Sequence, residues 1–600
     1  MNDLELLRAY EPIAGYTRGE PFFPAAVDEY VKMCSLWLTN PQGEDQLLVP
    51  HGMLDVDRLA DYVEIPAGHT MYMRFVDKPL EGLNYQRWLR DPQRDRFVAP
   101  GRLARVPLVF RLADLFFNLS FFVRGRVPWG LSAAAELRYR EIERLDPRRV
   151  YYGRVVRSGG WIALQYLFFF PMNSWRSGFF GINDHEADWE QVFVFLTENQ
   201  EGDPKPQWVA YASHDFKGDD LRRRWDDPLL VRKGNHPVIF AGAGSHASYF
   251  EQGEYLMGFE PKFLRPLKRV LVRASELWYE SLGMGSKTFV QDRNRSMLSV
   301  PFIDYARGDG RWIGPDQREN WSPEIISDEV GWVHKYRGLW GLDTRDPFGG
   351  ERAPAGPKYN RDGSVRQSWF DPVGWAGLNK VFPPVVLTEK IEERLENVRT
   401  EINSLKSEIM IQRTELRKQA LDVEALKVTE YDDNLRLKKE ADLDQAQNNL
   451  LNLQARETEL IESQRALAAY AQRVSQGDMG SPTAHLRHVH HPEPPLPPQH
   501  RIVEIWAALS GAAILLGIVL LLIFRPDSWV IWLVGLGMIM GAIENLVRRN
   551  LVNYLLSIII FLAIIAALIL LVEFWEWILA LLLIGLVIFI IRGNLQELRR

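Results

Sequence analysis

The segment Trp161-Ile-Ala-Leu-Gln-Tyr-Leu-Phe-Phe-Phe170 decides the fold class of the larger part of the chain. It reads as a strand, and similar short segments bounded by turn residues recur around it. These segments are Tyr151–Val156, Trp189–Leu196, Trp208–Ser213 and Pro237–Ala241. Residues 1–385 contain no phosphate-binding Walker loop, no dinucleotide-binding glycine motif and no cysteine-based zinc pattern. The pattern predicts an all-β domain with inserted helices over residues 1–385.

An acidic cluster with one histidine follows in the run Asp184-His-Glu-Ala-Asp-Trp-Glu190. Alternate side chains of a strand share a face, so we expect Glu186, Asp188 and Glu190 to point together. Three carboxylates on one face repel unless a cation or a basic side chain neutralises them. His185, where the preceding turn ends, could join them as a fourth ligand. Oxygen donors with one imidazole suit Ca²⁺, Mg²⁺ or Mn²⁺ better than Zn²⁺. The run therefore predicts either a divalent-cation site or a solvated acidic strand.

The motifs of residues 8–384 resemble those of two known families. The pattern His-x-x-Asp-Trp-Glu after the aromatic segment Tyr166–Asn173 resembles the necrosis- and ethylene-inducing-like proteins. The resemblance is nearer still to the vacuolar protein sorting-associated protein 62 family of plants and fungi. The other supporting motifs are Gly19-Glu20-Pro21-Phe22-Phe23-Pro24, Ser213-His214-Asp215, His236-Pro237-Val238, Gly244-Ser245-His246-Ala247-Ser248-Tyr249, Gly356-Pro357, Trp369 and Asp371-Pro372.

This resemblance implies a β-sandwich with a divalent cation, Ca²⁺ or Mg²⁺, in a cleft. The first His, the Asp and the Glu of the toxin motif fall on His185, Asp188 and Glu190. The upstream Asp of the toxins corresponds to Asn173, at a longer spacing, and Ala187 replaces their second His. Since an Asn ligand supplies oxygen without charge, we expect a weaker site. The toxins are secreted and bind plant sphingolipid headgroups. We expect no secretion signal here and carry over the fold and the site, without the toxicity.

One apolar segment inside the predicted β-domain, Leu103–Val123, resembles a membrane span. Arg105, Arg111 and Asp114 interrupt it, and its periodicity is helical. We therefore expect an amphipathic or buried helix at this position.

Residues 386–475 are predicted to form a coiled coil. Neither Gly nor Pro occurs between Leu387 and Val474, and six apolar residues have the 4-3-4-3-4 spacing of a coiled-coil seam. These are Ile391, Leu395, Val398, Ile402, Leu405 and Ile409. A second heptad rhythm begins at Leu443, one residue out of phase. The segment fits two helices folded back at residues 431–434, which we favour, or one unbroken helix. Either form would act as a spacer or would join copies into a homo-oligomer.

Residues 476–500 are rich in Pro, Gly and Ser and are predicted to be a flexible linker. The linker contains His485, His488, His490 and His491. Clustered histidines can bind transition metals. Because no fixed geometry holds them, we interpret this segment as a solvated linker.

Residues 501–600 carry four apolar segments in succession, joined by short polar stretches. They are Ile502–Phe524, Trp529–Val547, Leu551–Val572 and Trp575–Ile591. About 20 helical residues cross the hydrocarbon core of a bilayer. Four such segments in a row leave no polar face for a soluble fold, so we predict four transmembrane helices.

The arginines beside these segments indicate the orientation. They gather before the first span, between the second and third, and after the fourth, at Arg501, Arg548, Arg549, Arg592, Arg599 and Arg600. An even number of spans places both ends on one side, and positive residues favour the cytoplasmic side. We therefore expect both termini in the cytoplasm. Glu504 and Glu544 lie near helix ends beside arginines, so we expect interfacial ion pairs there and no ion path.

The net charge of −6 is small and spread along the chain, so nucleic acid is not expected as a partner. We expect a membrane-anchored protein that presents a cation-binding domain on a spacer and binds lipid headgroups or a partner in membrane sorting or tethering. The alternative is a metal-dependent hydrolase anchored to the membrane, using His185, Asp188, Glu190, His214 and His246 around the metal.

Overall fold

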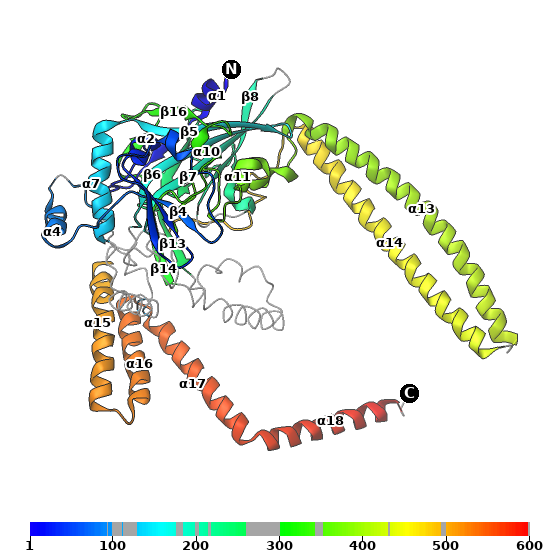
Figure 1. The fold of residues 1–600 in the computed structure, drawn as a ribbon. Helices are drawn as coiled ribbons and strands as arrows, with labels where there is room; N and C mark the ends of the chain where they lie inside the picture. Colours follow the sequence, from blue (N-terminus) through cyan, green and yellow to red (C-terminus); the bar gives the residue numbers. More distant parts are fainter. Residues whose placement is uncertain are drawn as a thin grey trace. The chain divides into compact units, whose positions relative to one another are not determined.

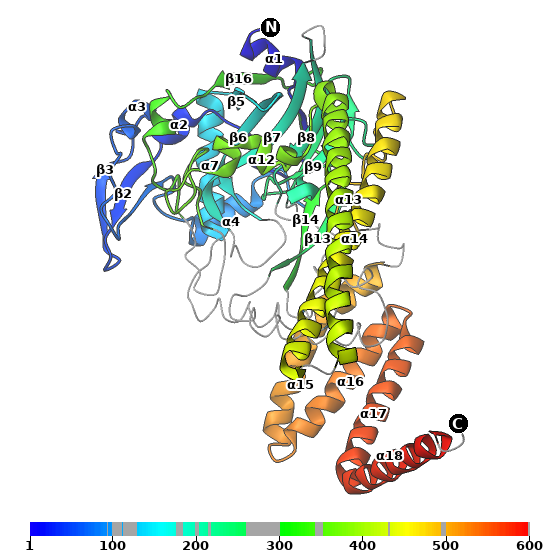
Figure 2. The same cartoon turned by 90° about the vertical axis from the view of Figure 1, so that its right-hand side faces the viewer.

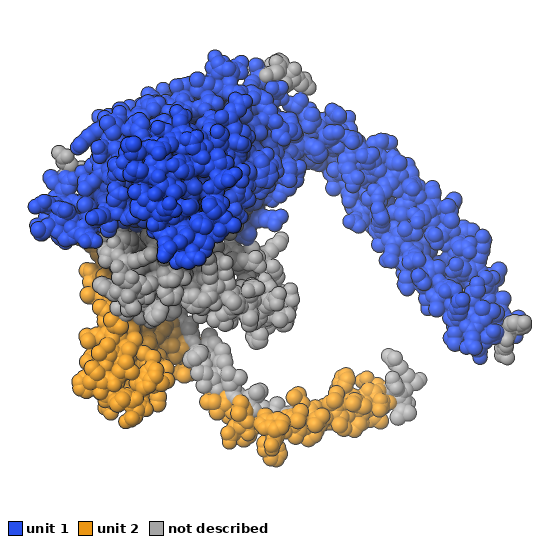
Figure 3. All heavy atoms as spheres, in the orientation of Figure 1, with its two compact units in different colours: residues 1–97, 127–255, 304–493 blue, residues 98–126, 256–303, 494–600 orange. Residues whose placement is uncertain are grey.

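The computed structural model describes residues 1–92, 94–98, 108, 111, 129–175, 184–198, 203–213, 218–259, 300–342, 352–429, 432–493 and 500–597. The chain divides into two compact units, coloured separately in Figure 3. Unit 1 comprises residues 1–97, 127–255 and 304–493, and unit 2 comprises residues 98–126, 256–303 and 494–600. The chain therefore passes between the units more than once.

The N-terminal half is β-rich, as predicted, and its largest sheet has the strand order β16-β5-β6-β7-β8-β9 (Figure 2). The strands are β5 (Arg149–Ser158), β6 (Trp161–Asn173), β7 (His185–Glu198), β8 (Pro204–Tyr211), β9 (Arg222–Arg224) and β16 (Trp321–Ile325). Neighbours are antiparallel, except that β16 runs parallel to β5. Every residue of β6 is buried. A strand covered on both faces is apolar throughout, which explains the run of aromatic residues in β6.

Residues of β7 alternate between two apolar clusters on the two faces of this sheet. Val192 and Val194 belong to the main core, whereas Phe193 and Phe195 pack in a second cluster with residues 373–378. The second cluster includes part of the short helix α12 (Pro372–Trp375). Both faces of the central strands are therefore covered, and the apolar residues on both faces follow from this.

Smaller sheets complete the β-rich region. A five-stranded sheet has the order β10-β11-β1-β15, with β12 also paired to β11; further sheets are β3-β2-β4 and β13-β14. Their strands are β1 (Ile13–Gly15), β2 (Ser35–Thr39), β3 (Asp45–Val49), β4 (Thr70–Arg74), β10 (Arg232–Lys233), β11 (His236–Ala241), β12 (Ser248–Tyr249), β13 (Gly253–Phe259), β14 (Val300–Ala306) and β15 (Trp312–Ile313). The Tyr211 hydroxyl of β8 donates a hydrogen bond to the Val238 carbonyl of β11 at 3.1 Å, so the two largest sheets are in contact.

Short helices are inserted between the strands, as predicted. They are α1 (Asp3–Tyr10), α2 (Val27–Lys32), α3 (Val56–Leu59), α4 (Gly82–Arg90), α7 (Trp129–Leu145), α10 (Gly331–His334) and α11 (Gln367–Phe370), with 3-10 turns η2 (Gly218–Leu221) and η5 (Leu378–Lys380). In α1 the Asn2 side chain accepts a hydrogen bond from the Glu5 backbone, and Glu5 accepts one from the Asn2 backbone. This capping box satisfies backbone donors that the first helical turn leaves unpaired.

Residues 384–475 form two long helices, α13 (Pro384–Thr429) and α14 (Asp433–Ser475), which lie side by side in Figures 1 and 2. Asp432 caps α14 by accepting backbone hydrogen bonds. Leu405, Ile409 and Leu450 are buried together between the helices. Glu401 and Arg456 form an ion pair of 2.6 Å across the pair. The chain therefore folds back at the break that the sequence indicated.

Spin labels at positions 401 and 456 are expected to lie within about 20 Å of each other, because the axes of packed helices are about 10 Å apart. One unbroken helix would separate the same positions by roughly 80 Å. Pulsed electron paramagnetic resonance on the detergent-solubilised monomer measures this distance. A population at the long distance would contradict the hairpin.

The described part of the predicted linker, residues 476–493, contacts the β-rich region instead of remaining solvated. The ring of His485 lies 3.0 Å from the Arg222 carbonyl, through Nε2. The Asp220 carboxylate accepts the backbone N–H of His488 at 3.0 Å and lies 3.1 Å from its Nδ1. Burial lowers the pKa of His485. The sequence indicated flexibility from composition alone and could not show these carboxylate and carbonyl partners.

The helices of the C-terminal region are α15 (His500–Phe524), α16 (Trp529–Val547), α17 (Leu551–Glu573) and α18 (Trp575–Glu597). Three helical stretches in the described residues are long and apolar enough to cross a membrane: Arg501–Phe524, Trp529–Val547 and Trp575–Gln596. These stretches suggest membrane association. A crossing by α17 stays a prediction. Of the expected helix Leu103–Val123, residues 108 and 111 are helical and the others lie outside the described residues.

Candidate functional site

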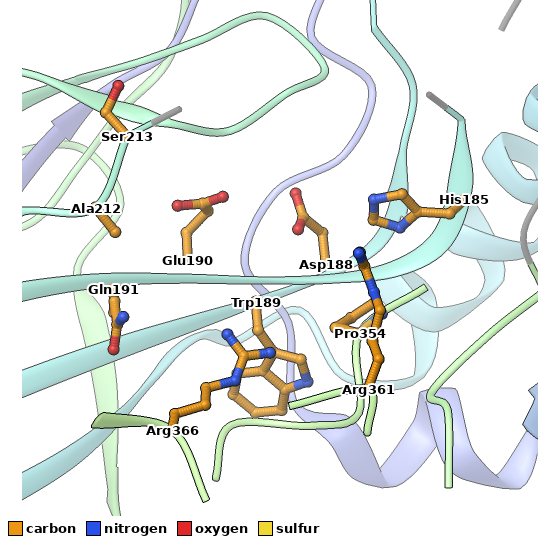
Figure 4. Close-up of a pocket in the computed structure, with 10 residues that line it drawn as sticks. All are labelled: His185, Asp188, Trp189, Glu190, Gln191, Ala212, Ser213, Pro354, Arg361 and Arg366. Atoms are coloured by element: carbon orange, nitrogen blue, oxygen red, sulfur yellow. The ribbon is translucent and has the colours of Figure 1, made fainter. Parts of the chain in front are cut away.

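The candidate site lies where β6 ends and β7 begins. The ladder pairs Asn173 with His185 and Phe170 with Asp188. Between them, Ala187 has a φ of 58°, which non-glycine residues rarely adopt. This distortion interrupts the regular alternation of side chains along β7. Figure 4 shows His185, Asp188 and Glu190 on one side of the strand.

The expectation that Glu186 shares the face of Asp188 and Glu190 is wrong. The Glu186 side chain is fully buried, and its carboxylate accepts backbone N–H groups at 2.9, 2.7 and 2.9 Å. The donors are Phe75, Val76 and Leu342. Burial raises the pKa of Glu186 to about 7, while these three hydrogen bonds act to lower it. Glu186 therefore joins distant segments of backbone and is not a ligand in the pocket.

A pocket of about 200 Å³ opens beside the predicted ligands (Figure 4). Its lining is mostly polar and charged. The lining residues are His185, Asp188, Trp189, Glu190, Gln191, Ala212, Ser213, Pro354, Arg361 and Arg366. The structure therefore brings three of the predicted ligands into one pocket. It adds two arginines from a loop far along the chain.

Among the described residues, three buried atoms at the site that can accept a hydrogen bond have no partner: Nε2 of His185, Oδ1 of Asn173 and Oγ of Ser213. The Nδ1 atom of His185 lies 2.7 Å from the Ala187 carbonyl, which can only accept, so Nδ1 carries the proton. In the neutral ring, Nε2 then presents a lone pair. Directly opposite residues of an antiparallel pair have Cβ atoms about 5 Å apart. The Asn173 and His185 side chains thus present two electron-pair donors from adjacent positions.

The buried imidazole of His246 holds Asp188 in place. The sequence predicted His246 only as a possible residue of the cleft. Nδ1 of His246 donates a hydrogen bond to Asp188 at 2.9 Å, and the Asn173 amide donates to the same oxygen at 3.2 Å. The His246 ring stacks on Phe170, with ring centres 3.8 Å apart. Burial acts to lower the pKa of His246, but Asp188 and Glu20 raise it to about 9. His246 is therefore an imidazolium at neutral pH.

Glu20 positions the loop that carries His246. Its carboxylate accepts the backbone N–H groups of Gly244 at 2.6 Å and Phe22 at 3.1 Å, and it lies 3.6 Å from Nε2 of His246. Gly244 has a φ of 74°, and a Cβ atom there would lie 1.8 Å from the Ser174 carbonyl oxygen. Only glycine fits so close to the end of β6. Two motifs far apart in the sequence therefore meet at Asp188.

A family model described as necrosis inducing protein (NPP1) matches residues 140–239. The match includes the β6–β7 pair and Asn173, His185, Asp188 and Glu190, whereas Glu20 and His246 lie outside it. The resemblance noted in the sequence is thus supported for this segment.

One solved structure, titled "Toxin fold for microbial attack and plant defense", is similar at 22% sequence identity and a TM-score of 0.12. The likeness covers 15% of this chain and 38% of that chain, so it spans well under half of the known structure. A distant similarity of this extent supports no conclusion about substrate or partner. No curated protein matches the chain.

The donor types at the site fit a divalent cation, although the side chains are not yet gathered around one point. Among the described residues, no group of three or more His, Cys, Asp or Glu side chains is already placed to hold a metal ion. His185, Asp188 and Glu190 nevertheless line one pocket, and Nε2 of His185 and Oδ1 of Asn173 are unpaired. A cation would satisfy both atoms if the carboxylates moved toward it. His214 lies outside the described residues.

Sequence reasoning missed Arg361 and Arg366 and gave no role to Glu20. Glu20 stands in a motif that was recognised, but no local pattern links it to Asp188. The two arginines are fixed by hydrogen bonds from Nε to backbone carbonyls, from Arg361 to Ala353 at 3.0 Å and from Arg366 to Tyr359 at 2.9 Å. Nothing in the composition of residues 352–366 distinguishes these arginines from surface arginines.

Proposed function

We propose that this chain is a membrane-anchored binding protein whose β-rich domain binds a divalent cation, Ca²⁺ or Mg²⁺, and through it a lipid headgroup or a partner protein. His185, Asp188, Glu190 and Asn173 would hold the cation, which would supply positive charge to an anionic or hydroxyl-bearing ligand. The ligand would lie in the adjoining pocket. Membrane sorting or tethering is the process that this arrangement would serve.

The unpaired acceptors of His185 and Asn173 carry this proposal. An unsatisfied buried polar atom costs about 1–3 kcal/mol, so two from cross-strand neighbours need an explanation. The hydrogen bond from His185 to the Ala187 carbonyl orients the ring, in the way that outer hydrogen bonds orient metal-binding histidines. A solvated acidic strand would not bury His185, which is 1% exposed.

The hydrolase alternative has less support. A general base must be unprotonated at the working pH, whereas His246 has a pKa of about 9 and is held between two carboxylates. Its ring is also stacked on Phe170 and 1% exposed. His246 therefore fits a role in positioning Asp188.

We further propose that the anchor consists of four transmembrane helices with both termini in the cytoplasm, and that the long helices are a coiled-coil spacer. The heptad spacing from Ile391 to Ile409 supports the spacer, which would also permit a homo-oligomer. The motif order supports a β-sandwich of the vacuolar protein sorting-associated protein 62 family. Relatives of that family would then share the proposed site.

The proposed cation binding is tested by thermal unfolding of the full chain in detergent. Excess EDTA is expected to lower the melting temperature of the β-rich domain, and millimolar Ca²⁺ or Mg²⁺ to restore it. A ligand that binds only the folded state stabilises it by about 2.7 kcal/mol at a hundredfold excess over its dissociation constant. Asp188→Asn removes one ligand charge, and His185→Gln replaces the imidazole nitrogen by an uncharged amide oxygen, so each should weaken this response.

The matched control is Glu198→Gln, which removes an exposed carboxylate from the same strand and should leave the EDTA response unchanged. Equal melting of the wild type and Asp188→Asn, with and without chelator, would mean that the strand binds no cation. Metal analysis of the purified protein gives a second, independent readout.

A further inference from the structure

Unit 2 buries a charged side chain that comes from the N-terminal part of the chain. Arg111 is 3% exposed, and the chain reaches it by leaving unit 1 at residue 97 and returning at residue 127. Nη1 of Arg111 donates a hydrogen bond to the Ser510 hydroxyl at 2.7 Å, and Nη2 forms an ion pair with the Glu544 carboxylate. Arg111 therefore contacts both α15 and α16.

Its partners form a buried polar cluster between two apolar helices. Glu544 also accepts hydrogen bonds from the Trp506 indole, at 2.5 Å, and from Arg548, which directly follows α16. On α15 the residues at the contact lie three and four apart, which places them on one helix face. They are Ala507, Ser510 and Ile514, at 4%, 0% and 6% exposure.

Removing a charge from water is costly unless a partner and hydrogen bonds compensate it. The side chains of Arg111 and Glu544 are 3% and 6% exposed, so each depends on the other. Arg548 alone could neutralise Glu544 at the end of α16, as the sequence indicated. The ion pair with Arg111 is therefore additional to what Glu544 needs for neutralisation within its own helix.

We propose that Arg111 makes a second membrane attachment for the β-rich domain, independent of the connection through residues 494–499. The domain would be held both by the chain leading into α15 and by Arg111, which stands between α4 and α7 in the sequence and contacts Ser510 of α15 and Glu544 of α16. Its partner is the chain's own helix pair, with the surrounding lipid. Arg111 belongs to the apolar sequence Leu103–Val123, and its charge is paired with the Glu544 carboxylate.

The test separates the two attachments in the full-length protein. A protease site inserted within residues 494–499 allows the covalent connection to be cut in isolated membranes, which are then washed with high salt and sedimented. The N-terminal fragment is expected to remain in the pellet. Arg111→Ala and Glu544→Ala should each lower the retained fraction at least tenfold, while the exchange Arg111→Glu with Glu544→Arg should restore most of it.

The control is Arg525→Ala, which removes an exposed arginine from the joint between α15 and α16. It should leave retention unchanged. Release of the wild-type fragment on cutting would overturn the proposal, and so would equal retention of the wild type and both alanine variants. Rescue by the charge exchange distinguishes a lost ion pair from misfolding, because a misfolded variant would not recover when a second residue is changed.

Discussion

Replacing Glu186 by alanine is expected to lower the free energy of unfolding of the β-rich domain by about 4 kcal/mol. Three backbone N–H groups, from Phe75, Val76 and Leu342, would lose their acceptor inside the core. Each buried donor left unpaired costs about 1–3 kcal/mol. Water that enters the space left by the side chain would bond some of these donors, so the total cost stays below three times the largest single cost. Urea unfolding of the full chain in detergent, followed by tryptophan fluorescence, measures the loss.

Two variants make this measurement specific. Glu198→Ala removes an exposed glutamate from the same strand and should change the free energy by less than about 0.5 kcal/mol. Glu186→Gln keeps the volume and one acceptor oxygen, so its cost should fall between the other two. A Glu186→Ala protein as stable as the wild type would show that Glu186 does not join these segments.

Replacing His246 by alanine is expected to lower the free energy of unfolding by about 3–5 kcal/mol at pH 6. The Asp188 and Glu20 carboxylates would then lose the imidazolium that lies between them. The cost should depend on pH. The pKa of His246 is raised from 6.5 to about 9, so the folded state binds this proton more tightly than the unfolded state. The contribution to stability is therefore complete below pH 6.5 and is lost as pH rises through 9, by about 3 kcal/mol in all.

Unfolding of the wild type and His246→Ala between pH 6 and pH 10, with EDTA present throughout, checks this sign. The difference between the two proteins should shrink as pH rises. His69→Ala removes a ring whose Nδ1 lies 3.2 Å from the nearby Ala67 carbonyl; it serves as the control and should follow the wild type. A difference that stays constant across the range would mean that His246 is neutral in the folded protein.

Much of the architecture was predictable because it is encoded in local patterns. The strand signals at Trp161–Phe170 and Trp189–Leu196 were correct, since most residues of both segments are apolar and buried in the sheet. The break between α13 and α14 was visible as a phase change in the heptad spacing. Three of the four predicted C-terminal spans coincide with helices in the described residues that are long and apolar enough to cross a membrane.

The candidate site was predictable only in part. Its donor residues were found from their chemical types, and three of them line one pocket. Strand periodicity failed at Glu186, because Ala187 has a left-handed φ that no local pattern indicates. The linker at residues 476–500 was predicted to be solvated because of its composition. The contact of His488 with Asp220 could not be predicted, because the two residues lie far apart in the sequence.

Strands, long helices and apolar helices could be recognised from the sequence, because periodicity and apolar length act over neighbouring residues. The contacts of Glu20 with His246, of Glu186 with backbone donors and of Arg111 with Glu544 depend on the folded chain. Each of these contacts joins residues far apart in the sequence. The cost of burying a charge selects the partner, and that cost exists only once folding has removed the water around it.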